Sequence, residues 1–309
     1  MKVVLYSNEK NRWDEFVQQA KNTNFLFYRD FLEYHHDRFD DFSLMIFDKK
    51  DKLLALLPAN KTDNTLHSHQ GLTYGGFILS PKIKLSVMTE VVKKTKDFLQ
   101  KHQIKKLIYK PSPYIYHDKP SQEDLLALSQ ENIKLFKRDI QQVIPLKKHF
   151  SYSNGRKHSI RKAKEFGFLV EKSDDFKSFW DILESVLKTQ HNSKPVHSLK
   201  EIEYLYSLFP KKIELYLVKK DNKLFAGAVV FVNKDVVKLQ YVANFDEGRK
   251  LGALDFLIDR LIKEFYHDKS WFDFGTSSDK DGINFGLIDQ KERFGASGVL
   301  CDTYLWDLS

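Results

Sequence analysis

The chain has 309 residues, enough for two domains of ordinary size, and 42% of them are hydrophobic, which excludes global disorder. It contains no apolar run near the roughly 18 residues of a membrane helix, and its single cysteine, Cys301, excludes a disulfide framework and a cysteine-based zinc site. The net charge of +8 fits a lysine-rich surface or attraction to an anionic ligand, but basic and aromatic residues do not interleave, so DNA is not an expected partner.

The first half of the chain opens on MKVVLYSNEKNRW, which turns polar too soon for a signal peptide and therefore predicts a cytoplasmic location. Apolar periodicity and turn residues then predict the elements of this half. They are helices at 11–20 and 29–39, a strand hairpin at 43–59, a polar loop at 67–76, an amphipathic helix at 85–103 and a short strand at 105–110.

The second half repeats this order. Its expected elements are helices at 176–190 and 198–209, a hairpin at 213–230, a strand at 236–244, a helix at 251–266 and a strand at 271–275. Setting Lys52 on Lys223 aligns the two hairpins without a gap, and both halves continue as strand, loop, helix, strand. An in-phase repeat of this length predicts two copies of one α/β domain with mixed sheets, at 1–145 and 146–309.

A strand followed by a loop that opens a helix resembles the GNAT acyltransferase fold. Arg249-Lys250-Leu251-Gly252-Ala253-Leu254 matches part of the family pattern Gln/Arg-x-x-Gly-x-Gly/Ala, with Leu254 at its last position. In that family the loop holds the diphosphate of coenzyme A (CoA) on backbone N–H groups. The resemblance implies acyl-CoA as co-substrate, with no metal. It implies cofactor-binding roles for Gly248, Arg249, Lys250, Leu251 and Gly252, and polarisation of the acyl carbonyl beside Val242 and Ala243.

The tandem arrangement resembles the FemABX-like branch, in which two GNAT domains occur in one chain. Two long segments carry the resemblance, Asn154–Phe168 and Trp271–Ala296, the second with a Lys-x-x-Phe-Gly motif. YHHDRFDDFSLMIF and HSHQGLTYGG resemble motifs of the first domain. Gln290 departs from the pattern, because an aromatic residue is common before the motif lysine.

GNAT enzymes usually attack the thioester directly, so the expected catalytic groups are proton carriers. His69, on a glycine-containing loop, has a free pKa suited to accepting a proton, although a structural histidine would fit the same loop. Asp273 is a second candidate, with an ordinary strand carboxylate as the alternative. His35 and His36 are adjacent on a predicted helix, so their side chains diverge and a shared metal is not expected.

The acceptor is expected to carry phosphates. Lys157, Arg161 and Lys164 share one helical face, which favours either a solvated basic helix or an anion clamp. The residues predicted to bind the acceptor are Arg38, Tyr74, Arg161 and Lys291.

Three functions agree with these observations. The first is an N-acyltransferase that moves an acyl group from acyl-CoA to a nucleotide-linked amino sugar for surface polysaccharide. The second, implied by the FemABX-like resemblance, is a peptidoglycan-bridge enzyme that takes an amino acid from aminoacyl-tRNA. Residues 174–209 predict two ordinary helices and leave no room for the long arm that such enzymes often carry. The third is a non-catalytic binding protein that has kept the fold.

Overall fold

The computed structural model describes residues 1–279 and 282–309, which form two compact units. Unit 1 consists of Met1–Asp139 together with Leu300–Ser309, and unit 2 of Ile140–Val299. The chain passes between the units in two strands, β9 (Lys134–Pro145) and β17 (Ser297–Asp307). The unit boundary therefore lies at 139/140, six residues before the sequence-based boundary, and the last ten residues group with the first unit.

Unit 1 has two small sheets. Its elements are β1 (Lys2–Leu5), α1 (Lys10–Gln19), η1 (Phe25–Phe27), α2 (Arg29–Glu33), β2 (Asp40–Asp41), β3 (Leu44–Phe47), β4 (Leu53–Leu57), β5 (Asn60–Thr62), β6 (Thr65–His67), β7 (Ile78–Leu79), α3 (Leu85–Lys101), β8 (Lys106–Tyr109), η2 (Tyr114–Tyr116) and α4 (Glu123–Ser129). One sheet has the strand order β1-β3-β4-β7, and the other has β17-β8-β6-β5-β2. The predicted first hairpin is confirmed as the antiparallel pair β3–β4.

The last ten residues belong to unit 1 because they complete its core. β17 pairs with β8 in antiparallel register, and Trp306 is fully buried among the apolar side chains of this unit. The Trp306 indole donates to the carbonyl of Glu131 at 3.1 Å, and the N–H of Leu308 donates to the carbonyl of Lys105 at 2.9 Å. Nothing local in the sequence marks this return, because strand pairing between distant segments is decided by the tertiary fold.

Unit 2 contains one larger sheet with helices on both faces. Its further elements are α5 (Asn154–Phe166), β10 (Leu169–Ser173), α6 (Phe176–His191), α7 (Leu199–Leu208), β11 (Ile213–Lys220), β12 (Lys223–Val232), β13 (Val236–Asn244), α8 (Asp246–Leu251), α9 (Ala253–Arg260), η3 (Leu261–Phe265), β14 (Trp271–Thr276), β15 (Ser278–Asp279), β16 (Gly282–Ile283) and α10 (Phe285–Glu292). The strand order is β10-β11-β12-β13-β14-β9.

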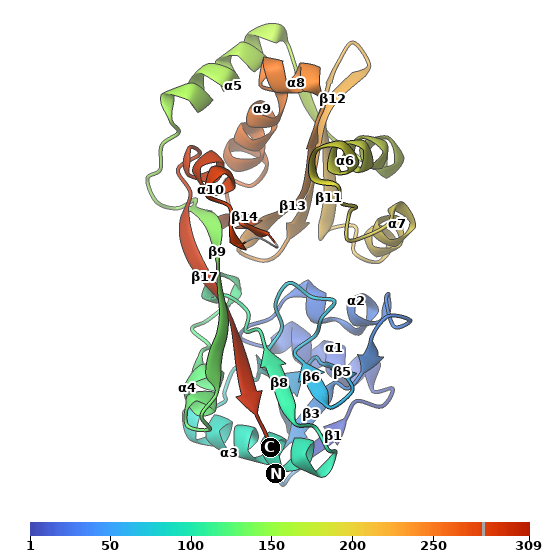
Figure 1. The fold of residues 1–309 in the computed structure, drawn as a ribbon, viewed down its shortest axis with the longest axis vertical. Coiled ribbons are helices and arrows are strands. Elements are labelled where there is room, and N and C mark those ends of the chain that lie inside the picture. The colour runs from blue at the N-terminus through green and yellow to red at the C-terminus, as the bar shows by residue number, and fades with distance from the viewer. Residues whose placement is uncertain (280–281) are drawn as a thin grey trace. The chain divides into compact units, whose positions relative to one another are not determined.

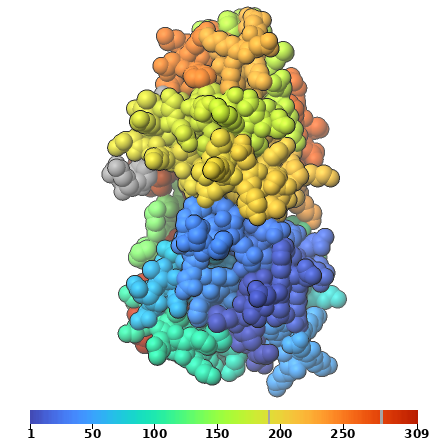
Figure 2. Space-filling view, turned by 90° about the vertical axis from the view of Figure 1, so that its right-hand side faces the viewer, coloured from blue at the N-terminus to red at the C-terminus, as the bar shows by residue number. Residues whose placement is uncertain are grey.

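The helices of unit 2 form two layers (Figure 1). α5, α8 and α9 lie against one face of the sheet, and α6 and α7 lie against the other, where Figure 2 shows their atoms in yellow and yellow-green. α6 approaches β12 closely, since a Cβ on Gly227 would meet the Phe179 ring at 2.5 Å. In the described part of the chain, no helix combines the length and apolar character needed to cross a membrane.

The feature that positions the site is a split between β13 and β14. Their parallel pairing joins Val236–Lys238 to Trp271–Asp273 and ends there in the described chain. Just beyond, the pairing of β13 with β12 shifts between Leu239 and Tyr241, which leaves Gln240 as an extra residue in the strand. A bulge of this kind bends and twists a strand. β13 therefore diverges from β14, and a gap opens in the sheet.

A buried acid in unit 1 predicts a pH dependence of stability. Asp124 accepts a hydrogen bond from the hydroxyl of Tyr109, and burial raises its pKa to about 6 from the ordinary 3.8. Because the folded state holds this proton more tightly, its stabilising effect is complete below pH 4 and is lost as the pH rises through 6. The loss amounts to about 3 kcal/mol. Urea unfolding between pH 4 and 7 should show this decline for the wild type and a flatter profile for Asp124→Asn.

Candidate active site

The gap between β13 and β14 opens into two adjoining cavities of unit 2. The inner one, of about 290 Å³, has apolar walls that include Leu239, Phe274 and Phe294. The outer one, of about 840 Å³, extends to the first turn of α9. Six residues line both, so the cavities form one path from the surface to the split in the sheet. They are Arg156, Val242, Leu254, Asp255, Leu287 and Gln290.

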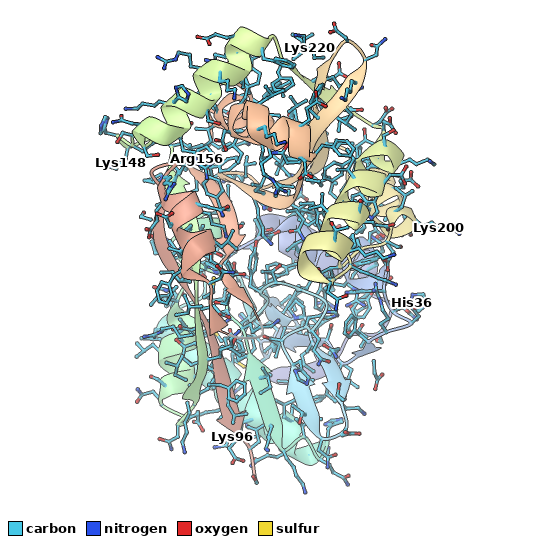
Figure 3. The ribbon with its side chains drawn as sticks, turned by 45° about the horizontal axis from the view of Figure 1, so that its top comes forward. His36, Lys96, Lys148, Arg156, Lys200 and Lys220 are labelled. Atoms are coloured by element: carbon cyan, nitrogen blue, oxygen red, sulfur yellow. The ribbon has the colours of Figure 1, made fainter. Side chains whose placement is uncertain are left out.

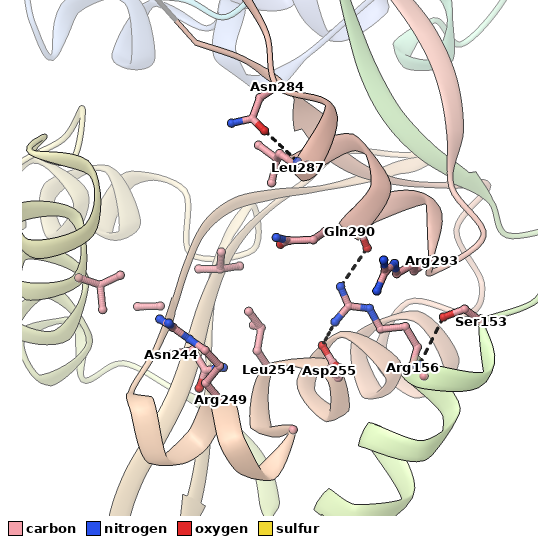
Figure 4. Close-up of a pocket in the computed structure, with 16 residues that line it drawn as sticks. Ser153, Arg156, Asn244, Arg249, Leu254, Asp255, Asn284, Leu287, Gln290 and Arg293 are labelled. Carbon is pink, nitrogen blue, oxygen red and sulfur yellow. Dashed lines mark hydrogen bonds and ion pairs between the residues drawn. The ribbon is translucent and has the colours of Figure 1, made fainter.

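Arg156 and Asp255 meet where the two cavities join (Figure 4). Arg156 is in the first turn of α5, which Ser153 caps, and its guanidinium donates to the carboxylate of Asp255 and to the carbonyl of Gln290 at 3.0 Å. The same guanidinium lies 4.4 Å from the centroid of the Phe294 ring. Both charged side chains are less than 20% exposed, so this ion pair ties α5, α9 and α10 together around the site.

The predicted CoA loop is largely helical. Residues 246–251 form α8, and Gly252 then ends it in the left-handed conformation, with φ +77°, before α9 begins. A Cβ at Gly252 would lie 2.5 Å from the carbonyl oxygen of Ser159 in α5, so glycine is required by both the backbone and the close approach. The sharp break directs the first turn of α9, with Leu254 and Asp255, into the cavities.

Gly252→Ala is therefore expected to destabilise unit 2. Gly167 is the matched control, because it also has a positive φ, of +86°, but nothing lies within 4 Å of a Cβ there. The left-handed conformation should cost about 1–2 kcal/mol in either alanine variant. The overlap with Ser159 should add about 1–3 kcal/mol for Gly252→Ala alone. Urea unfolding of the two variants measures the difference, and equal losses would contradict the close packing.

The predicted cofactor residues divide into two groups. Val242, Ala243, Arg249 and Gly252 line the outer cavity. Gly248, Lys250 and Leu251 do not appear in the described lining of either cavity. Gly248 packs against the carbonyl of Phe225, and the carbonyl of Lys250 accepts a hydrogen bond from Lys162 at 3.0 Å. Arg249 is exposed and has a loose ion pair with Asp246 at 3.8 Å, so it can turn toward a ligand.

Lys291 lines the inner cavity but points inward to the protein. Its ammonium donates to the carbonyls of Gly275 and Thr276 at 2.9 and 2.8 Å and to the hydroxyl of Ser277 at 2.8 Å. Burial lowers its pKa to about 8, although the nearby carboxylate of Asp273 acts in the opposite direction. An ammonium has three protons, and all three are used here. A phosphate would have to displace one of these bonds.

Asp273, the predicted proton acceptor of this unit, is fully buried in β14. One carboxylate oxygen accepts a hydrogen bond from the N–H of Gly275 at 2.7 Å. Asp273 does not appear in the described lining of either cavity, so its place in the structure is that of a strand carboxylate beside Lys291.

Two of the predicted site residues, His69 and Tyr74, lie in unit 1 and are buried. His69 is 2% exposed, its Nδ1 accepts from the N–H of Gly71 at 3.2 Å, and burial, helped by the charge of His35, lowers its pKa to about 3. The imidazole is therefore neutral but shielded from solvent. Tyr74 is buried, and its hydroxyl accepts from the side-chain amide of Asn24 at 2.8 Å.

The other two predicted acceptor residues are exposed. The Arg38 guanidinium lies 5.6 Å from the centroid of the Tyr34 ring. Arg161 is on the outer face of α5, with an Nη atom 3.1 Å from Nδ1 of His158. Residues 280–281 of the predicted closing segment lie outside the described residues.

Asp255, Gln290 and Arg293 line the cavities but were not predicted as site residues. Asp255 directly follows the loop motif, which ends at Leu254, so its position next to the motif was the one signal in the sequence. Among the described residues that line the two cavities, it is the only carboxylate. No three His, Cys, Asp or Glu side chains of the described chain gather into a metal-binding cluster.

Comparison with known proteins agrees with this geometry. Residues 152–281 match the model of the acetyltransferase (GNAT) domain family. FemX is 14% identical, with a TM-score of 0.71 over 99% of this chain and 97% of that one. L-PGS from Bacillus licheniformis is 13% identical (TM-score 0.64, covering 99% and 94%). A tandem GNAT protein from the clavulanic acid biosynthesis pathway is 10% identical (TM-score 0.54, covering 100% and 98%). No curated protein matches.

Residues 152–281 of unit 2 thus match the acetyltransferase (GNAT) domain family, and this match supports an acyltransferase. The chain shares its fold with FemX and with the tandem GNAT protein, so the predicted FemABX-like tandem GNAT fold is confirmed.

Proposed function

We propose that this protein transfers an acyl group to an amine in the cavities between β13 and β14. The observation that carries the proposal is that an unpaired strand edge and a single carboxylate line the same cavities. Beyond Lys238, the edge of β13 that faces β14 has no partner strand in the described chain. Its N–H and C=O groups can therefore pair with an extended donor, as an added strand does. Asp255 lines the same space.

The chemistry follows from these groups. The donor carbonyl lies beside Val242 and Ala243, where a backbone N–H polarises it. The amine nitrogen bonds to the carbonyl carbon, and the tetrahedral intermediate then expels the thiol or hydroxyl of the donor. Asp255 accepts the proton that the nitrogen loses, and the leaving group takes up a proton on departure.

For the donor we propose acyl-CoA, and for the acceptor a nucleotide-linked amino sugar used in surface polysaccharide. Arg249 and Arg293 lie at the outer cavity and offer guanidinium groups to phosphate. Arg249→Ala should weaken acyl-CoA binding roughly tenfold. Lys250→Ala, the neighbouring change of the same charge, should leave it unchanged, because Lys250 is absent from the described cavity lining. Equal effects of the two changes on the dissociation constant would remove the outer cavity as the donor site.

Aminoacyl-tRNA is the second candidate donor, and one observation favours it. Asp255 lies in the first turn of α9, where a GNAT enzyme would hold the CoA diphosphate, and its partner Arg156 reaches it from α5. A carboxylate there offsets the positive end of the helix and weakens the attraction for a diphosphate. The FemABX-like fold agrees with this donor as well. The acceptor would then be a peptidoglycan precursor.

Turnover assays distinguish the candidates. The purified protein is incubated with labelled acetyl-CoA, longer acyl-CoAs or aminoacyl-tRNA, each with a nucleotide amino sugar or a peptidoglycan precursor, and transfer of label to the amine is measured. Thermal unfolding gives an independent measure of binding, because a ligand at 100 times its dissociation constant adds about 2.7 kcal/mol. Transfer from acyl-CoA supports the first donor and transfer from tRNA the second. Binding without transfer from any donor would favour a non-catalytic binding protein.

A further inference from the structure

A second charged groove lies on unit 2, between α5 and the α9–η3 segment. It has a volume of about 320 Å³, and its lining includes Tyr152, Lys157, Arg161, Lys164, Asp259 and Lys263. None of its lining residues lines the cavities of the candidate active site. Figure 3 shows α5 along one edge of the unit, with nitrogen-tipped side chains directed away from the sheet.

A buried carboxylate organises the cations of this groove. The side chain of Asp259 is 3% exposed, and its two oxygens lie 2.6 Å from the ammonium of Lys263 and 3.7 Å from that of Lys164. The Lys263 ammonium also lies 4.5 Å from the centroid of the Tyr152 ring. Two lysines from different helical segments are thus held toward one space, which a solvated basic helix would not require.

The groove keeps a surplus of positive charge. Lys157 and Arg161 have no ion-pair partner among the described residues, and both are exposed on the face of α5 that carries Lys164. Four cations therefore face one carboxylate, a net charge of +3 in one groove. Most exposed lysines and arginines of a protein are matched by nearby acids or dispersed, so a surplus concentrated in a concave site attracts anions.

A buried hydroxyl completes the groove. Tyr152 is 7% exposed, and its hydroxyl lies beside the buried carboxylate of Asp259. Burial, the charge of Asp259 and a hydrogen bond to its carboxylate all raise the pKa of Tyr152, so the hydroxyl stays protonated. Tyr152 thus helps to hold the carboxylate around which the lysines of the groove gather.

We propose that this groove is a binding site for a phosphate or diphosphate group of a small ligand. Lys157, Arg161, Lys164 and Lys263 supply the positive charge, and Tyr152 and Asp259 form the buried base of the groove. The groove is small and enclosed on two sides by helices, which favours a compact anion over a membrane surface. Large apolar side chains, which a membrane-bound helix needs beside its basic residues, do not occur among its exposed lining.

Titration calorimetry with inorganic pyrophosphate at low salt tests the proposal on the intact protein. Saturable binding is expected, and it should weaken as ionic strength rises. Lys157→Ala and Arg161→Ala should each weaken it roughly tenfold or more. Lys200→Ala combined with Lys211→Ala removes two exposed charges elsewhere on the unit and should have no effect.

Two results would overturn the assignment. One is binding that Lys157→Ala and Arg161→Ala leave unchanged, since the cations of the groove would then not hold the anion. The other is binding of a 12-nucleotide single-stranded RNA that depends on Arg161 while pyrophosphate does not bind. The groove would then be one contact of a nucleic-acid backbone. Both substitutions are at exposed positions of α5, and thermal unfolding checks that the variants are folded.

Discussion

Asp255→Asn should lower the rate of acyl transfer by about 100-fold to 10 000-fold, the usual effect of removing a positioned proton acceptor. Asn keeps the size of the side chain and can still accept a hydrogen bond from Arg156, so the cavity walls are retained. It cannot take the proton of the attacking amine. The loss should therefore fall on kcat, with a smaller change in KM.

The control for this change is Asp181→Asn. Asp181 is an exposed carboxylate of α6 that pairs with Lys177, and it does not appear in the described lining of the cavities. Its rate should match that of the wild type. If Asp255→Asn kept full activity, Asp255 would not be the proton acceptor. If only KM rose, it would bind the amine without taking its proton.

Lys291→Met should destabilise unit 2 by about 3–5 kcal/mol, as expected for one partner of a buried charge cluster. Methionine fills a similar volume but leaves the carbonyls of Gly275 and Thr276 without their donor. It also removes a cation beside the buried carboxylate of Asp273. Because these carbonyls end β14 at the inner cavity, the split in the sheet should lose its shape, and transfer should fall with stability.

The comparison for this change is Lys211→Met, at an exposed lysine of the same unit, which should alter the free energy of unfolding by less than about 0.5 kcal/mol. Ser277→Ala isolates one of the three hydrogen bonds and should cost about 1 kcal/mol. Urea unfolding measures all three variants. A Lys291→Met protein as stable as the wild type would show that the ammonium is not a structural contact, and the phosphate-binding prediction for Lys291 would regain support.

Local sequence patterns were sufficient to predict most of the helices and strands. The hairpin β11–β12 and the helix α6 follow from period-two and helical apolar spacing, and the structure contains both. The three basic residues expected on one face of α5 do line one groove. The predicted CoA loop, in contrast, is mostly the short helix α8, which tolerates Gly248 in its middle and ends at Gly252.

Site residues were harder to predict, because the chemistry of a side chain does not reveal its burial. His69 has the right residue type for a proton acceptor, yet it lies 2% exposed beside His35. Lys291 has the right charge to bind a phosphate, yet its ammonium donates to the backbone at the end of β14. Asp255 matched no motif and became a candidate only when α9 was seen to direct it into the cavities.

The sequence by itself determined the α/β character, the repeated order of elements and the resemblance to tandem GNAT proteins, because these depend on spacing along the chain. Tertiary structure alone decided where the first unit ends, since residues 300–309 return to pair with β8, a contact between distant segments. It also decided which charges are exposed and which are buried. The split between β13 and β14 arises from a bulge at Gln240 and the packing around it, and no local property of these strands encodes the cavity that results.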